Sequence, residues 1–128
     1  MCHDVCMSRL LHHDLSGAVL GGFYNSYDEI GPGFPETVCQ NALAVELRHL
    51  GIPFAREVRY PVHYLGVEVG LYRADFVVAD SIIVEIKCAD RIGKDPIRQV
   101  LYYLKASGLS VGLILNFGPR ASIKRVIR

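Results

Sequence analysis

The sequence predicts an α/β fold in which helices pack against a sheet. Segments rich in Val, Ile and aromatic residues follow one another between residues 57 and 88, as strands do. Segments with apolar residues at helical spacing lie on either side of this strand region. The continuous apolar run at 110–117 is typical of a strand covered on both faces. We therefore expect helices and strands to form packed layers.

The helices are predicted from their spacing and from the residues at their ends. A first helix is expected over 14–30, and the stretch GPGFPE at 31–36 ends it. Pro35 then suits the first position of a second helix, which runs to about Leu50. A third helix begins near Asp95 and ends at Gly108, since glycine commonly follows the last turn of a helix.

The strands are predicted from β-branched and aromatic content. We expect strands over 57–64, 67–79 and 81–88, with the stretch VADS as the turn between the last two. The run SVGLILNF at 110–117 is a fourth strand, and ASIKRVIR at 121–128 is either a short last strand or a frayed tail. The expected order is therefore α-α-β-β-β-α-β(-β).

Length and composition limit the classes of function. The 128 residues suffice for one domain over 1–128 with its own core, and residues 1–13 are candidates for a loosely ordered N-terminal segment. The net charge of +1 gives no overall sign of nucleic-acid binding, so an anionic partner needs a local basic patch. No apolar run is long enough to span a bilayer, and the start lacks a signal peptide. We expect a cytoplasmic protein without a membrane partner.

The four cysteines do not follow the spacing of a standard metal site. They are Cys2, Cys6, Cys39 and Cys88, and no two of them form a CxxC pair. In a reducing compartment we expect thiols. The start MCHDVC, which includes His3, could with His12 and His13 ligate zinc, but its spacing matches no zinc finger. An N-terminal zinc site is therefore the weaker interpretation.

The hairpin segment RADFVVADSIIVEIK, which starts at residue 73, contains three charged side chains among apolar ones. Alternate residues of a strand share a face, so Glu85 and Lys87 lie together. Asp75 joins them only if the turn has an odd number of residues, for instance 79–81. A two-residue turn would place Asp75 opposite Ile86 and separate the charges. The grouping therefore requires a three-residue turn or an equivalent bulge.

Two interpretations of this charged face stay open. In the first, the charges form the solvated side of a half-buried sheet, which is common in antiparallel sheets. In the second, Asp75 and Glu85 hold a divalent cation, because close carboxylates repel without one and oxygen ligands suit Mg²⁺. Lys87 could then stabilise negative charge, orient a water or, if desolvated, act as a base.

Glu36 and Gln99 are further candidates on the predicted helices. Glu36 continues the apolar stripe of the second helix, which is made of Cys39, Leu43, Leu47 and Leu50. It is therefore either a residue favoured by the helix dipole or a carboxylate of the site. In the third helix, Gln99 lies beside a stripe expected to face the core, with a tyrosine one turn further on. That stripe is Ile97, Leu101 and Leu104, and the tyrosine is Tyr102 or Tyr103.

The order of these residues resembles the PD-(D/E)xK nuclease superfamily and, within it, the GxxExxY family of small prokaryotic proteins. The similar stretches, spread between about residues 11 and 118, are IGPGFPE, NALAVELRHLGIPF, PVHYLG, ADFVV, IIVEIK, PIRQVLYYLKASG and VGLILNFG. Cys39 stands where the family name has its tyrosine, so a hydroxyl is lost and any role it had is in question.

The resemblance implies a restriction-endonuclease-like core, in which helices flank a mixed sheet. It implies that Asp75 and Glu85 bind Mg²⁺ or Mn²⁺, that Glu36 completes the metal site, and that Lys87 is the catalytic lysine. Gln99 matches a position that orients substrate or water. The implied reaction is metal-assisted hydrolysis of a phosphodiester bond in nucleic acid, with DNA as the expected partner.

A nucleic-acid partner would also need cations around the site. Basic residues close to it in sequence form a candidate rim, although such charges are usually only solvated. They are Arg73, Arg91, Lys94 and Arg98, with Lys105 beyond them. A homodimer would allow two strands to be cut. The alternative function is a nuclease-like module that binds nucleic acid or a protein without efficient catalysis, which the neutral charge and Cys39 favour slightly.

Overall fold

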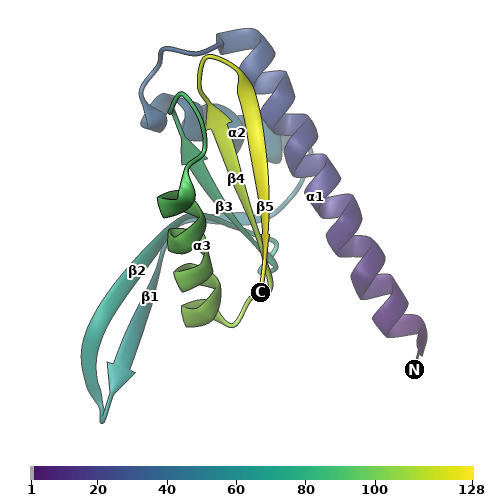
Figure 1. Cartoon of the computed structure of the whole chain (residues 1–128). Helices are drawn as coiled ribbons and strands as arrows, with labels where there is room; N and C mark the ends of the chain where they lie inside the picture. The colour runs from purple at the N-terminus through teal and green to yellow at the C-terminus, as the bar shows by residue number, and fades with distance from the viewer. Residues whose placement is uncertain (1) are drawn as a thin grey trace.

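The computed structural model describes the backbone of residues 2–128 and the side chains of residues 14–128. The chain forms a five-stranded sheet with helices on both faces (Figure 1). The zinc ligands considered at the N-terminus all lie within residues 1–13, outside the described side chains. Within the described part of the chain, no helix is long and apolar enough to cross a bilayer.

Two helices cover one face of the sheet. Helix α1 (Cys2–Ile30) begins earlier than the expected residue 14, and α2 (Glu36–His49) follows after the predicted break. Gly22 lies inside α1, where glycine is a poor helix former. A Cβ at this position would lie 3.1 Å from Cβ of Glu46 on α2. The glycine therefore allows the two helices to approach closely.

The sheet has the order β1-β2-β3-β4-β5. Its strands are β1 (Phe54–Tyr64), β2 (Val67–Val78), β3 (Ile82–Lys87), β4 (Val111–Phe117) and β5 (Ala121–Ile127). Only β3 and β4 are parallel, and α3 (Lys94–Ser107) connects them across the other face. The predicted order and the mixed sheet are confirmed, and the last segment is a strand and not a frayed tail.

Two apolar clusters form the core. The cluster beneath α1 and α2 includes Phe23 and Phe117, whose ring centroids are 5.0 Å apart in an edge-to-face arrangement. The cluster beneath α3 includes Ile83, Val100 and Ile114. Strands β3 and β4 supply side chains to both clusters. Burial on both faces explains why their sequences are nearly continuous apolar runs.

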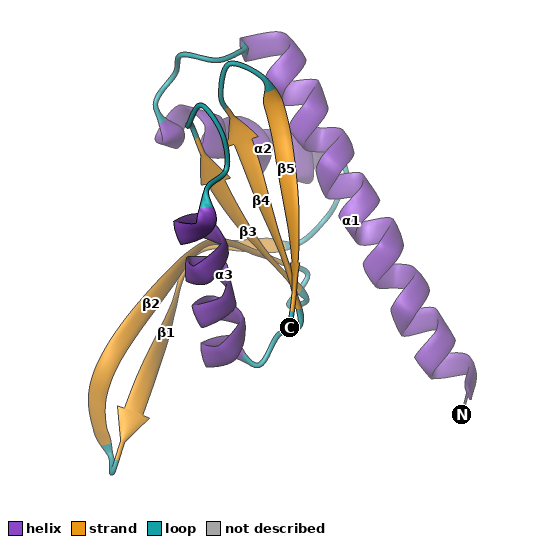
Figure 2. Ribbon diagram, viewed as in Figure 1, coloured by secondary structure: helices purple, strands orange, loops and turns teal. Residues whose placement is uncertain are grey.

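The β1–β2 hairpin projects beyond the body of the sheet, past α3 (Figure 2). Phe76 of β2 belongs to the cluster beneath α1 and α2, whereas Ala74 belongs to the cluster beneath α3. The switch from one cluster to the other falls at Asp75 of β2 and at Glu57 of β1. These two residues lie between the paired residues Arg56–Phe76 and Val58–Ala74. Glu57 has a φ of 53°, in the left-handed region that is costly for residues other than glycine. The hairpin thus changes direction beside Asp75.

Candidate active site

The turn between β2 and β3 places Asp75 opposite Glu85. Val78 pairs with Ile82, so the loop contains three residues, 79–81. The predicted odd-numbered turn is therefore confirmed. The pairs Val77–Ile83 and Phe76–Val84 continue the same register toward the two acidic residues.

Two hydrogen bonds from backbone to side chain hold the carboxylates across the strands. The N–H of Asp75 donates to Oε1 of Glu85 over 3.1 Å, and the N–H of Ile86 donates to Oδ2 of Asp75 over 2.8 Å. Glu85 is only 3% exposed, and Asp75 is half-buried. Each carboxylate is thus fixed by a backbone N–H of the opposite strand.

Burial raises the pKa of both carboxyl groups. The pKa of Glu85 rises to about 8, first because burial disfavours its charged form and then because the charge of Asp75 repels it. Burial also raises the pKa of Asp75, although the hydrogen bond from Ile86 acts in the opposite direction. The pair therefore retains a proton near neutral pH. A divalent cation would displace this proton, because metal ligands must be deprotonated.

Lys87 and Gln99 complete the polar group at the end of β3. Nζ of Lys87 lies 3.8 Å from Oε2 of Glu85 and donates a hydrogen bond of 3.3 Å to Oε1 of Gln99 on α3. The structure thus brings Asp75, Glu85, Lys87 and Gln99 together, as the sequence pattern predicted. Their roles in catalysis and metal binding stay predictions.

Asp75, Glu85 and Lys87 form an Asp…Glu-x-Lys arrangement on adjacent strands of a mixed sheet. The family model described as the PD-(D/E)XK nuclease superfamily matches residues 13–126. The chain belongs to this superfamily. Among curated proteins, no match to the chain is found.

Two solved structures are similar to this PD-(D/E)XK chain. The crystal structure of SSO0001 has 19% sequence identity and a TM-score of 0.56, with coverage of 72% of this chain and 49% of that one. This chain therefore spans about half the length of SSO0001. Hjc of Archaeoglobus fulgidus, a Holliday junction resolvase from an archaeal hyperthermophile, has 20% identity and a TM-score of 0.42, with coverage of 69% and 73%. The likeness to SSO0001 supports the restriction-endonuclease-like fold alone.

Tyr103 is a residue of this PD-(D/E)XK site that the sequence did not distinguish from Tyr102. Its side chain is 4% exposed, and its pKa is raised mainly by burial and then by the charges of Glu85 and Asp75. The two carboxylates are thus close enough for their charges to act on its hydroxyl. Tyr103 follows Gln99 by four residues, which places both on one side of α3. This spacing was the available signal.

The apolar stripe expected on α3 was partly wrong. The helix buries Val100, Tyr103 and Leu104, whereas Leu101 is 37% exposed. Val100 and Leu104 are four residues apart and share a helical face with Tyr103, so the true stripe is rotated by about one residue from the expected one. This rotation turns Tyr103 inward and leaves Tyr102 at the surface, 50% exposed.

Glu36 does not point toward the core, in contrast to the prediction from the stripe of α2. Residues 32–38 are all exposed, so α2 meets the core only from Cys39 onward. The charge of Glu36 still raises the pKa of Asp75, so it lies at the site end of the helix. Among the described side chains, no three His, Cys, Asp or Glu residues converge as metal ligands. The buried Asp75–Glu85 pair suits Mg²⁺, which commonly uses one or two carboxylates and completes its shell with water and phosphate oxygens.

Glu57 is an acidic residue near the site that the sequence pattern did not indicate. It lies on β1, opposite Asp75 of β2. Its side chain is exposed, and its Oε2 lies 3.9 Å from Nε of Arg73. Its charge also raises the pKa of Asp75. Its left-handed backbone gives no signal in the sequence, because glutamate is not typical of that conformation.

The predicted basic rim is exposed throughout. Arg98 lines a cavity of about 510 Å³ together with Lys87 and Gln99, so it lies beside the site. Arg98 is 3.7 Å from Asp95, and Arg73 is 3.9 Å from Glu57, but exposed pairs of this kind bind weakly. The other two members of the rim are Arg91 and Lys94, both exposed. All four are therefore free to turn toward a phosphate.

Cys39 and Cys88 meet next to the site. Cys39 is 1% exposed, and its Sγ lies 3.8 Å from Sγ of Cys88, the residue that follows Lys87. Both are free thiols, as expected. Burial raises the pKa of Cys39 to about 12, so the thiol is neutral and acts as a small apolar side chain. Position 39 is thus part of the core beneath α1 and α2.

Proposed function

We propose that this protein is a divalent-metal-dependent nuclease of the GxxExxY family, which hydrolyses phosphodiester bonds in nucleic acid, with DNA as the first substrate to test. One observation carries the proposal. Glu85 is buried and Asp75 half-buried, the two are linked by hydrogen bonds across β2 and β3, and Lys87 lies beside Glu85. A sheet face that was only solvated would not bury a glutamate to 3% exposure beside another carboxylate.

In this proposal, each polar residue of the site has a separate role. Asp75 and Glu85 hold Mg²⁺ or Mn²⁺, with Glu36 as the third carboxylate on the open side. The bound ion would supply an activated water and neutralise charge on the phosphate. Lys87 stabilises the negative charge that develops on the phosphate oxygens. Gln99 accepts a hydrogen bond from Nζ of Lys87 and so keeps the ammonium group directed at the site.

Cleavage by purified protein tests this function. We expect Mg²⁺- or Mn²⁺-dependent cleavage of single-stranded, duplex or branched DNA, or of RNA. Asp75→Ala and Lys87→Ala should each abolish it. Asp28→Ala and Lys124→Ala are matched controls, since both residues are exposed and lie on α1 and β5, outside the strands and helices that carry the site residues. Cleavage that persists unchanged in both site variants would come from a contaminant and would reject the assignment.

The alternative is a nuclease-like module that binds nucleic acid or a protein without cutting. The observation in its favour is that only two carboxylates converge among the described side chains, together with Cys39 at the position of the family tyrosine. Metal binding without cleavage of any substrate would support this alternative. Cleavage lost in Asp75→Ala would exclude it.

The proposal also includes assembly and location. Two copies, each with one site, could cut both strands of a duplex as a homodimer, and we place the protein in the cytoplasm. Light scattering coupled to gel filtration checks the first part. A mass equal to one chain, with and without a duplex, would contradict the homodimer.

A further inference from the structure

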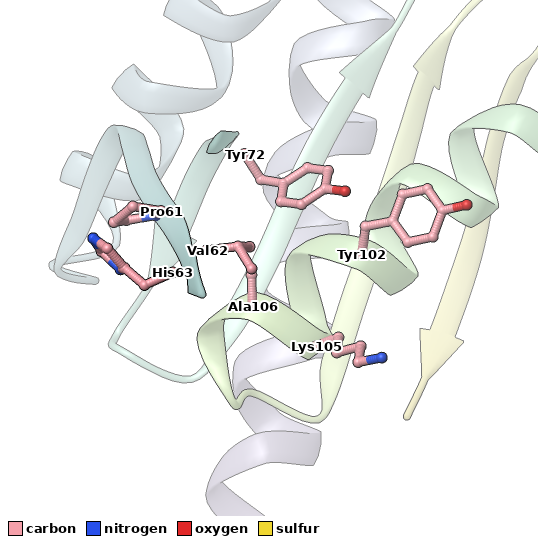
Figure 3. Close-up of a pocket in the computed structure, with 7 residues that line it drawn as sticks. All are labelled: Pro61, Val62, His63, Tyr72, Tyr102, Lys105 and Ala106. Carbon is pink, nitrogen blue, oxygen red and sulfur yellow. The ribbon is translucent and has the colours of Figure 1, made fainter. Parts of the chain in front are cut away.

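A second cavity lies between the β1–β2 hairpin and α3. Its volume is about 540 Å³, within the range of pockets that hold small organic groups. Val62 and Tyr72 of the hairpin line one side, and Tyr102, Lys105 and Ala106 of α3 line the other (Figure 3). None of these residues belongs to the metal-binding pair, so the cavity is a feature that the proposed chemistry does not use.

Two tyrosine rings, one from each side of this cavity, lie close together. The rings of Tyr72 and Tyr102 have centroids 5.8 Å apart and an angle of 39° between their planes. In Figure 3 the two side chains extend in the same direction from β2 and α3. Tyr102 is 50% exposed, and Val62 beside it is 36% exposed. Aromatic surface left open in this way suits a flat, partly apolar ligand that stacks on it.

The charges around Tyr102 suit an anionic chain on either side of such a ligand. Arg98, Tyr102 and Lys105 are separated by four and three residues, so they share one face of α3. The two cations are about 10 Å apart along the helix axis, at about 1.5 Å per residue. A nucleic-acid strand has this alternation of phosphate and base. This face of α3 therefore presents a cation, an aromatic ring and a second cation. The order matches phosphate, base and phosphate along a strand.

The cavity has a lining residue in common with the cavity at the candidate active site. Tyr102 lines both this cavity and the cavity formed by Lys87, Arg98 and Gln99. A strand with its phosphate beside Lys87 could thus follow α3 past Arg98 and place a neighbouring base against Tyr102.

We propose that the cavity between the hairpin and α3 binds one unpaired nucleobase of the strand that is cut. The identification of the ligand as nucleic acid rests on the proposed function, and the cavity adds the substrate class to it. A base in an intact duplex has both faces covered by its neighbours and cannot stack on Tyr102. The protein therefore prefers single-stranded or branched nucleic acid to a continuous duplex.

Fluorescence of 2-aminopurine tests this proposal without requiring cleavage. Short single-stranded DNA and RNA, each with one 2-aminopurine, are titrated with the full-length protein, without divalent ions and with Mg²⁺. The same DNA strand in a duplex is the comparison. We expect tighter binding of the single strands, with quenching as the base stacks on tyrosine. Comparison of the DNA and RNA arms shows which sugar the site accepts.

Tyr102→Ala should weaken single-strand binding about tenfold and remove the quenching, because stacking on one aromatic ring contributes on this scale. Tyr102→Phe should keep both, since the ring remains. Tyr24→Ala is the matched control, because Tyr24 is 42% exposed on α1, on the opposite face of the sheet. The proposal would be overturned by single-strand binding that is unchanged in Tyr102→Ala or equally weakened in Tyr24→Ala. Equal binding of duplex and single strand would also overturn it.

The outcomes separate this proposal from the proposed function. Binding with quenching but no cleavage would leave the base site standing and reject the nuclease. Metal-dependent cleavage that is equal in wild type and Tyr102→Ala on single strands would leave the nuclease standing and reject the base site. Thermal melting of both variants by circular dichroism shows whether either change affects the fold.

Discussion

The backbone N–H of Asp75 donates a hydrogen bond of 3.1 Å to Oε1 of Glu85, and this bond ties the two acidic residues together across β2 and β3. The position of one carboxylate thus depends directly on the backbone of the other. Because the two carboxyl groups lie close together, the ionisation of each depends on that of the other and on any bound cation. Five measurable consequences follow from this arrangement and from its surroundings.

Metal binding should release a proton. The pKa of Glu85 is raised to about 8, so at about pH 7 the group carries a proton that a cation must displace. Calorimetric titration with Mg²⁺ in two buffers of different ionisation enthalpy measures this release, which we expect to be about one proton. At about pH 9 the release should approach zero. Heats that are independent of the buffer at about pH 7 would contradict the raised pKa.

The metal-free protein should lose stability as the pH rises. The folded-state pKa of Glu85, about 8, lies above its ordinary value of 4.5, so protonation favours the folded state. This contribution is fully present below 4.5 and is lost as the pH rises through 8. We expect the melting temperature to fall by several degrees over this window. Glu85→Gln, which cannot ionise, should show a flatter profile, and parallel profiles would contradict the assignment.

The turn geometry predicts a stabilising substitution. Ala79 has a φ of 50°, a left-handed conformation that strains any residue with a Cβ. Ala79→Gly should therefore raise the free energy of unfolding by about 0.5–1 kcal/mol, less the entropy that glycine adds to the unfolded chain. Urea denaturation measures the difference. Ala55→Gly, in β1, is the control and should destabilise, because its strand conformation carries no such strain.

Deletion of Val77 should disrupt the site through the register. If Val78 stays paired with Ile82, the deletion moves Asp75 opposite Val84, one position from Glu85, which places the carboxylates on different faces. We expect the deletion variant to lose Mg²⁺ binding in calorimetry, with a loss of stability because β3 is buried on both faces. Asp80→Gly, which deletes no residue and so keeps the register, is the control and should bind Mg²⁺ like the wild type.

Much of this site could be predicted because its geometry is local. The alternation of side chains along a strand and the number of residues in the turn are enough to bring Asp75, Glu85 and Lys87 together. Glycine and proline indicated the end of α1 and both ends of α2 and α3 to within a few residues, although α1 begins well before its expected start. The continuous apolar run of β4 indicated burial on both faces. These features depend on neighbours in the chain, which the sequence contains.

The remaining features depend on contacts between distant segments. Glu36 was expected to face the core, but the amphipathic stripe of a helix does not show where along its length contact with the sheet begins. The choice between Tyr102 and Tyr103 required the rotation of α3 against the sheet, which is set by packing of Val100 and Leu104. The left-handed backbone of Glu57 follows from the bend of the hairpin and has no counterpart in residue type.

The burial of Tyr103 beside the carboxylates predicts a positioning role. Its ring packs in the cluster beneath α3, with its centroid 5.8 Å from that of Tyr72. Burial, and then the charges of Glu85 and Asp75, raise the pKa of its hydroxyl. Tyr103→Phe keeps the ring and removes the hydroxyl, so we expect the fold to survive. The loss of one hydrogen-bonding group at the site should lower kcat about fivefold to tenfold, with little change in KM. The pH profile of kcat should shift as well, because the ionisation of the carboxylate pair depends on its surroundings. Tyr102→Phe is the matched control on the exposed side of α3, and the same kinetics for both variants would contradict a specific role for Tyr103.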